Sequence, residues 1–268
     1  DWKEFHPHLE EKRLRNEQLN RLVQERTRQL EESNRALEDF SYALSHDLRT
    51  PLRHVVSFAD LLREELQAGN TAACLRNIDK IGQAARRMQE LIGGMLDFAR
   101  LGRSALRIGP ISVDAMIREV MAGLGSGAEG RAVEWHIPAD LPTIQGDAVL
   151  LREVWANLIE NALKYASKRD LIRVDIGWRQ DADGWEFLVR DNGVGFDPQA
   201  ADKLFGMFQR LHRDDEFKGT GIGLALVRKI VESHGGRIWA SAMPGQWAEF
   251  RFRLPFHVRP EADAASVG

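Results

Sequence analysis

The most informative segment of this chain runs Asn157-Leu158-Ile159-Glu160-Asn161-Ala162-Leu163-Lys164-Tyr165. It lies in a predicted helix over residues 147–166, in which apolar residues recur at helical spacing. Asn157 and Asn161 are four residues apart, so both amides project from one face of that helix. Amide oxygens suit a hard cation such as Mg²⁺, and Lys164 could reach a phosphate from the same region. A solvated polar face without a ligand is the alternative, and this helix alone does not decide between the two.

Two glycine-rich motifs follow this helix. One, Asp191-Asn192-Gly193-Val194-Gly195, comes directly after a predicted strand, and the other, Gly219-Thr220-Gly221-Ile222-Gly223-Leu224, opens a predicted helix. Glycines at such positions permit positive φ and close backbone approach, and a helix N-terminus offers amide donors to phosphate. Asp191 could accept a hydrogen bond from an exocyclic amine. Neither motif is a Walker A loop or a dinucleotide fingerprint, and a lone Gly-x-Gly more often marks a tight turn.

The remainder of the second half predicts a mixed α and β domain over residues 112–257. The predicted helices cover residues 112–124, 147–166 and 224–234, and the predicted strands cover 133–137, 172–178, 185–190, 238–242 and 248–254. Residues 180–184 predict a hairpin turn, and residues 197–218 are irregular and charged. The small and polar residues 258–268 predict a disordered tail.

The first 102 residues predict long helices. An apolar seam with alternating steps of four and three runs Leu19, Val23, Arg26, Leu30, Ser33, Leu37, Phe40 and Leu44. We interpret residues 1–39 as a signal-transmitting coiled-coil helix paired with a second copy; packing of the seam on the rest of this chain is the alternative. A helix-ending Gly69-Asn70 divides residues 40–102 into an antiparallel hairpin, and two hairpins in a dimer would form a four-helix bundle. Residues 103–111 are expected to be a linker.

The first helix of this hairpin carries Ser45-His46-Asp47-Leu48-Arg49-Thr50-Pro51-Leu52. Asp47 can accept a hydrogen bond from one imidazole nitrogen of His46, which leaves the other nitrogen as a nucleophile. Thr50 is four residues on and shares the His46 face. Pro51 should bend the helix, at a cost of ~3 kcal/mol in an ordinary context, which indicates a functional position. A surface histidine near a kink is the plainer alternative for His46 taken alone.

Composition excludes several classes of protein. The chain has 268 residues, 43% hydrophobic and 29% charged, which is enough for a buried core. Lys and Arg number 37 and Asp and Glu 40, a net charge of −3 that gives no support for nucleic-acid binding. The single cysteine, Cys74, excludes an intrachain disulfide and a thiolate metal cluster. No uncharged apolar run reaches the ~18 residues of a membrane segment. Because the chain begins at Asp1, we expect a cytoplasmic fragment whose upstream part is missing.

Together these motifs resemble the transmitter core of two-component sensor histidine kinases over about residues 40–254. The match consists of five segments in the family's order. They are His46–Leu52 for the H-box, Asn157–Tyr165 for the N-box, Asp191–Gly195 for the G1 box, Phe205–Phe208 for the F-box and Gly219–Gly223 for the G2 box. The resemblance implies a multidomain fold, α and then α/β. A coiled coil and a dimeric four-helix bundle of the HisKA type precede a Bergerat-type α/β sandwich of the HATPase_c type that binds ATP. Gly206-Met207 departs from the usual F-box, which leaves the details of the lid open.

The resemblance also implies residue roles. Asn161 would ligate Mg²⁺ with Asn157 nearby, Asp191 would bind the adenine amine, and Phe205 and Phe208 would anchor the lid unless they are ordinary core residues. The implied ATP contacts are Asn157, Asn161, Lys164, Tyr165, Asp191, Gly193, Gly195, Arg210, Gly219, Gly221, Gly223 and Leu224. A neutral nitrogen of His46 would attack the γ-phosphate of ATP, with Asp47 as general base and Mg²⁺ bridging phosphate oxygens.

Partners follow from the same resemblance. It implies a homodimer with a sensor domain upstream and a separate response-regulator receiver domain, whose aspartate takes the phosphoryl group. Asp47 with Thr50 three residues later resembles the motif of members that dephosphorylate their partner, so we hypothesise a kinase that is also a phosphatase. Other Bergerat-type ATPases lack the H-box hairpin. A degenerate transmitter, a dimeric scaffold without kinase activity, is the remaining alternative. The sequence around His46 resembles that of the phytochrome-like branch of these kinases.

Overall fold

The computed structural model describes residues 2–100, 105–124, 132–209, 211, 216–217 and 219–257. At residues 2–11, 29–44, 46, 97, 99 and 100 it describes the backbone alone. The chain divides into two compact units, Asp1–Arg53 and His54–Gly268. The expected tail over 258–268 lies outside the described residues. Within the described part, no helix is both long and apolar enough to cross a membrane.

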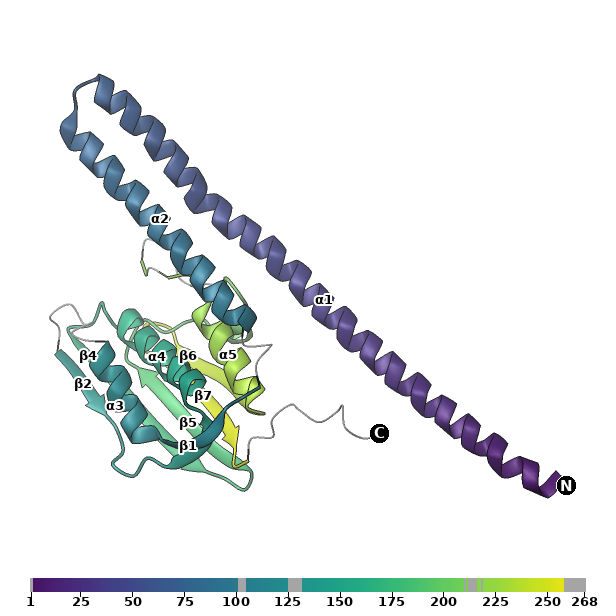
Figure 1. Cartoon of the computed structure of the whole chain (residues 1–268). Helices are drawn as coiled ribbons and strands as arrows, with labels where there is room; N and C mark the ends of the chain where they lie inside the picture. The colour runs from purple at the N-terminus through teal and green to yellow at the C-terminus, as the bar shows by residue number, and fades with distance from the viewer. Residues whose placement is uncertain are drawn as a thin grey trace. The chain divides into compact units, whose positions relative to one another are not determined.

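The helical half consists of α1 (Trp2–Gln67) and α2 (Thr71–Arg100), joined by a tight turn (Figure 1). The helix α1 continues through Pro51 without interruption. Gly69 adopts φ +74°, which ends α1, and Asn70 Oδ1 accepts the N–H of Ala73 at 3.2 Å, which caps α2. Across the hairpin, the Lys80 ammonium lies 4.7 Å from the centre of the Phe58 ring. The predicted hairpin of two antiparallel helices is therefore present in residues 54–100.

The second half is an α/β sandwich, as predicted. In the described residues one five-stranded sheet has the order β2 (Ala132–His136), β4 (Leu171–Gln180), β5 (Gly184–Asp191), β7 (Trp247–Pro255) and β6 (Arg237–Met243). The pair β2–β4 is parallel and the other pairs are antiparallel. Three helices, α3 (Val113–Gly123), α4 (Ala148–Tyr165) and α5 (Gly223–Ser233), cover one face of the sheet (Figure 1). Trp155 of α4 packs edge-on against Phe187 and Phe252 of the sheet, at ring distances of 5.6 and 5.3 Å.

A short strand pair was not predicted. Strand β1 (Ile108–Ser112) pairs antiparallel with β3 (Thr143–Asp147). The expectation of a linker over 103–111 is therefore wrong for residues 108–111. Gly109 and Pro110 lie inside β1 and are typical of a break in a strand pattern, because the proline lacks an N–H for a ladder.

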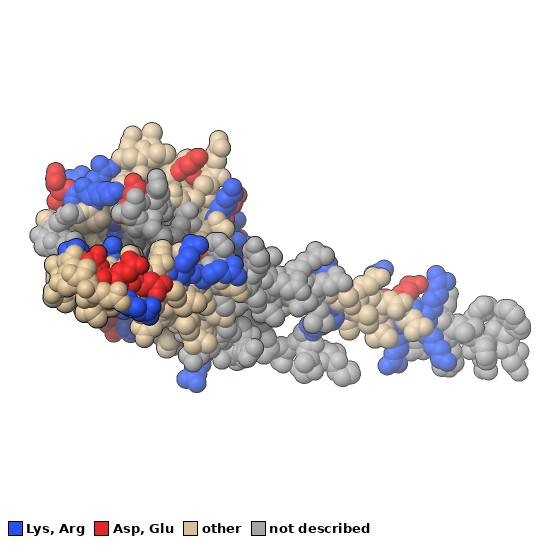
Figure 2. All heavy atoms as spheres, turned by 90° about the horizontal axis from the view of Figure 1, so that it is seen from above, with Lys and Arg blue, Asp and Glu red and all other residues tan. Residues whose placement is uncertain are grey.

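The start of α5 packs against α2. A Cβ at Gly94 would lie 3.1 Å from Ile222 Cδ1, so the missing side chain leaves room for Ile222. Lys229 Nζ donates a hydrogen bond to the carbonyl oxygen of Phe98 at 3.0 Å and lies 4.0 Å from the centre of the Phe98 ring. Elsewhere on the surface, Lys and Arg side chains lie beside Asp and Glu on the face drawn in Figure 2.

Candidate nucleotide-binding site

The helix α4 is held at its N-terminus by Asp147. Asp147 Oδ1 accepts the N–H groups of Val149 and Leu150 at 3.1 and 3.3 Å, which caps the helix. Its other oxygen accepts the N–H of Arg107 at 2.9 Å, and its own N–H donates to His234 Nε2 at 3.0 Å. The segment before β1, the helix α4 and the end of α5 thus meet at one residue.

His234 is fully buried and serves as an acceptor at this junction. Its Nδ1 donates to the carbonyl oxygen of Ile230 at 2.8 Å while Nε2 accepts from Asp147. Burial lowers the pKa of His234, which favours the neutral ring that this pairing needs. Sequence reasoning missed this residue, because a histidine at the end of a helix has no pattern that reveals its burial.

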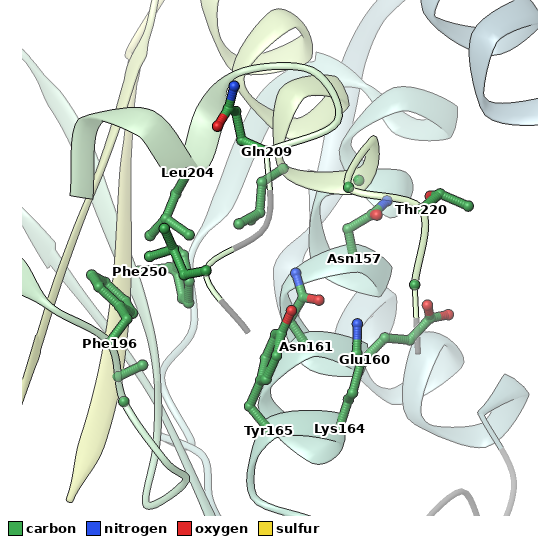
Figure 3. Close-up of a pocket in the computed structure, with 17 residues that line it drawn as sticks. Asn157, Glu160, Asn161, Lys164, Tyr165, Phe196, Leu204, Gln209, Thr220 and Phe250 are labelled. Carbon is green, nitrogen blue, oxygen red and sulfur yellow. The ribbon is translucent and has the colours of Figure 1, made fainter. Parts of the chain in front are cut away.

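One face of α4 lines a cavity of about 250 Å³. Asn157, Asn161, Lys164 and Tyr165 all reach it from α4, and Glu160 lies beside them (Figure 3). Asn157 Nδ2 donates to the carbonyl oxygen of Glu153 at 2.8 Å, so its amide orientation is fixed. Burial raises the pKa of Glu160, the charge of Glu153 adds to the rise, and Lys164 opposes it.

The second glycine motif lies directly against this face. A Cβ at Gly223 would lie 2.3 Å from Asn157 Oδ1, and one at Gly219 would lie 2.5 Å from Lys164 Nζ. A methyl group at either position would displace the end of the facing side chain, so the two glycines let the loop and these α4 side chains approach closely. Gly221 adopts φ +73° and also lines the cavity, as do Thr220 and Leu224. The fold thus brings the predicted residues of α4 and of this motif to one cavity.

The opposite wall of the cavity is apolar, and the sequence did not reveal it. Its side chains come from the segment after β5, from the 3₁₀ helix η1 (Pro198–Phe205), from the segment after η1 and from β7. They are Phe196, Leu204, Leu211, Ala248 and Phe250 (Figure 3). Phe205 is buried and packs edge-on against Phe250 at 6.5 Å, which agrees with the core alternative for that residue. Phe208 adopts φ +59° and donates its N–H to the Gly221 carbonyl oxygen at 2.9 Å.

Asp191 lies behind the cavity wall. It is 3% exposed and does not itself line the cavity, and neither does Gly193, whereas Gly195 and Ala248 do. Its Oδ1 accepts the N–H of Gly193 at 2.8 Å, and a backbone hydrogen bond from Ala248 also reaches the carboxylate. Burial raises the pKa of Asp191 to about 7 against the pull of these hydrogen bonds and of two nearby arginines.

Two protein families match the chain. Residues 36–104 match the His Kinase A (phospho-acceptor) domain, and residues 146–258 match the histidine kinase-, DNA gyrase B-, and HSP90-like ATPase. The chain belongs to the sensor histidine kinases. It carries their transmitter core, and every residue that lines the cavity falls within the matched ATPase region.

Known proteins are similar to this histidine kinase over most of its length. Cyanobacterial phytochrome A of Nostoc sp. (strain PCC 7120 / SAG 25.82 / UTEX 2576) is 37% identical over 227 residues, which are 84% of this chain and 29% of that relative. Across four curated relatives, this one included, the chain spans between 26% and 30% of their length.

Solved structures agree on the fold. Full-length ShkA in complex with AMPPNP has a TM-score of 0.52 and 29% identity, over 81% of this chain and 46% of that one. The histidine kinase ThkA in complex with the response regulator protein TrrA has a TM-score of 0.63 over 82% of this chain and 61% of that one. At 19% identity the second likeness concerns the fold alone.

The predicted catalytic residues of the kinase lie on α1, in the first unit. Asp47 and Thr50 are partly buried there. The side chain of His46 lies outside the described residues, and so does Arg210. Their roles stay predictions.

The donors at the cavity fit a magnesium ion that also binds nucleotide phosphates. Among the described residues, no three carboxylate, imidazole or thiolate groups gather into a metal site. The amide of Asn161 instead points into the cavity from α4 (Figure 3). An amide oxygen with few protein partners suits Mg²⁺, which keeps waters and phosphate oxygens as its other ligands.

Proposed function

We propose that this chain is the catalytic core of an ATP-dependent histidine kinase that phosphorylates its own His46. The observation that carries the proposal is the close approach of Gly223 and Gly219 to Asn157 and Lys164, which forms one cavity from two separate motifs. Amide donors at the start of α5 and the Lys164 ammonium suit phosphates. The apolar wall suits a flat base, and Asp191 behind it would accept a hydrogen bond from the adenine amine.

The reaction follows from the chemistry of the residues. An unprotonated ring nitrogen of His46 forms a bond to the γ-phosphorus of ATP as the bond to the β–γ bridging oxygen breaks and ADP leaves. The other ring nitrogen then releases its proton to Asp47. Asn161 would hold Mg²⁺, with Asn157 nearby, and the ion would supply charge neutralisation at the phosphates.

Two partners are part of the proposal. Apolar side chains of the hairpin remain exposed at Val56, Leu61, Leu75, Ile78, Ile92 and Leu96, between 44% and 59%, and a second copy would cover them. Leu19 and Val23 of the coiled-coil seam are also more than half exposed. The phosphoryl group would pass from His46 to an aspartate of a response regulator, in keeping with the partner of ThkA.

Labelling with γ-labelled ATP and Mg²⁺ tests the proposal on the full chain. We expect acid-labile, alkali-stable label on the parent, none on His46→Gln, and transfer to a receiver domain. The His46→Gln variant must bind ATP as the parent does, because the described residues that line the cavity run from Asn157 to Phe250 and belong to the ATPase region. Label retained on His46→Gln would refute the assignment of His46. A parent that binds ATP but never takes up label would identify a scaffold instead.

A second activity is favoured by the spacing of two residues on α1. Asp47 and Thr50 are one helical turn apart, so their side chains lie on neighbouring positions of one face. We propose that Thr50 orients the water that hydrolyses the aspartyl phosphate of the response regulator.

A further inference from the structure

Arg169 binds three backbone carbonyl oxygens in two separate turns. It follows α4, and its own N–H donates to the carbonyl of Ala166 at 2.9 Å. Its Nε donates to the carbonyl oxygen of Asn192 at 2.7 Å. One terminal nitrogen donates both to the carbonyl of Gly193 at 3.0 Å and to that of Gly245 at 2.5 Å. The guanidinium thus joins the end of α4 to the turn after β5 and to the turn between β6 and β7.

These two turns are in close contact with each other. The N–H of Gly245 donates to the carbonyl of Val194 at 2.6 Å. Gly195 has φ +61°, and a Cβ there would lie 2.3 Å from the carbonyl oxygen of Met243 and 2.7 Å from that of Trp247. A small displacement of either turn would therefore move Gly195, which lines the cavity.

The contacts of Arg169 differ from those of a surface arginine. Its guanidinium donates to main-chain carbonyls, and a carbonyl oxygen cannot move without its loop. A planar guanidinium with five N–H donors can satisfy several carbonyls at once, whereas a lysine ammonium at the same reach would satisfy fewer.

We propose that Arg169 is a positioning residue for the nucleotide base, because it fixes the turn that carries Asp191, Gly193 and Gly195 against the β6–β7 turn. The inference rests on the proposed function, in which the Asp191 carboxylate accepts a hydrogen bond from adenine. Arg169 acts through that turn and does not itself touch the nucleotide.

The charge of Arg169 gives the proposal a second readout. Two cationic side chains, Arg169 and Arg190, oppose the burial that raises the pKa of Asp191, together with backbone hydrogen bonds from Gly193 and Ala248. Only the ionised carboxylate accepts on both oxygens, so ATP affinity should fall as the pH falls through the pKa of Asp191. Removing the charge of Arg169 raises that pKa further and moves this acid limb to higher pH.

The experiment measures ATP binding to the full chain by calorimetry between pH 5.5 and 9. Arg169→Met should weaken ATP binding at pH 8 by roughly tenfold or more, since hydrogen bonds from a charged donor are lost, and should shift the acid limb upward. Arg169→Lys keeps the charge, so it should leave the acid limb near that of the parent while affinity stays reduced. The control is Arg228→Met, because Arg228 on α5 pairs with Glu232 on the surface, 2.7 Å apart, and should bind ATP as the parent does.

Two results would overturn the inference. The first is an Arg169→Lys variant that binds ATP with parental affinity, together with an Arg169→Met variant whose ATP affinity has the parental pH dependence. This result would show that Arg169 does not position the turn that carries Asp191. Asp191→Asn separates this failure from that of the proposed function, because it removes the ionisable group and should abolish the acid limb. An unchanged acid limb in Asp191→Asn would remove the base-site assignment and the role of Arg169 with it.

Discussion

A methyl group at Gly223 is expected to impair nucleotide binding while the domain stays folded. The Cβ of Gly223→Ala would lie 2.3 Å from Asn157 Oδ1, and ordinary contact begins at 3.4 Å, so the amide must retreat by about 1 Å. That retreat breaks the hydrogen bond from Asn157 to Glu153, worth about 0.5–1.5 kcal/mol. Alanine is favoured over glycine in a helix by up to ~1 kcal/mol. The two effects nearly cancel, and the melting temperature should change by no more than ~5 °C.

Activity should respond far more strongly than stability. A misplacement of ~1 Å in a group that positions a substrate can lower a rate by ~10²-fold. We therefore expect the rate of His46 labelling by γ-labelled ATP to fall ~100-fold in Gly223→Ala, with weaker ATP binding in calorimetry. Gly93→Ala is the matched control. Gly93 lies in α2, where an added Cβ would meet nothing within 4 Å, so this helical substitution should stabilise the chain and leave ATP binding unchanged. Parental ATP affinity and labelling in Gly223→Ala would refute the idea that Asn157 and Gly223 share one site.

Three further perturbations have defined outcomes. Burial raises the pKa of Asp191 to about 7 from its usual 3.8, so the folded state binds more protons and loses stability as the pH rises across that window. Asp191→Asn should therefore melt higher than the parent at pH 8 without ATP and not at pH 4, and equal melting at both would contradict this. His234→Ala should lower the free energy of unfolding in urea by at least ~2 kcal/mol, because the Asp147 N–H loses a buried acceptor. The control is His257→Ala, because His257 is exposed. Equal urea midpoints in the two variants would contradict a stabilising role for the hydrogen bond between Asp147 and His234. Thr50→Ala should abolish receiver dephosphorylation while His46 labelling persists, and continued dephosphorylation would remove Thr50 from the mechanism.

Local patterns predicted the elements whose causes are local. The helix expected over 147–166 is α4 at Ala148–Tyr165, because its apolar residues repeat with the helical period. The turn expected at 180–184 joins β4 and β5, with Asp181 Oδ1 accepting the N–H groups of Asp183 and Gly184. In both cases, the pattern that predicts the element lies within the element's own consecutive residues.

Features that depend on distant residues were out of reach. The strand β1 exists because Ile111 pairs with Ile144 of β3, and neither segment alone has a strand pattern strong enough to reveal it. The apolar wall of the cavity likewise combines Leu204 and Phe250, which ordinary burial would explain equally well. Only the tertiary fold brings these apolar residues together around one cavity.

Two of the residues that sequence reasoning predicted for the nucleotide site are unfavourable within their own elements. Gly223 begins a helix in which alanine would be favoured, and Asp191 holds a carboxylate in an apolar interior. Each departs from what its own element prefers, and such departures are typical of functional positions. Arg169 breaks no rule of this kind, since an arginine in a loop is ordinary. Its importance comes from three carbonyl groups in distant turns, so a positioning residue of this type can be recognised only once the backbone around it is known.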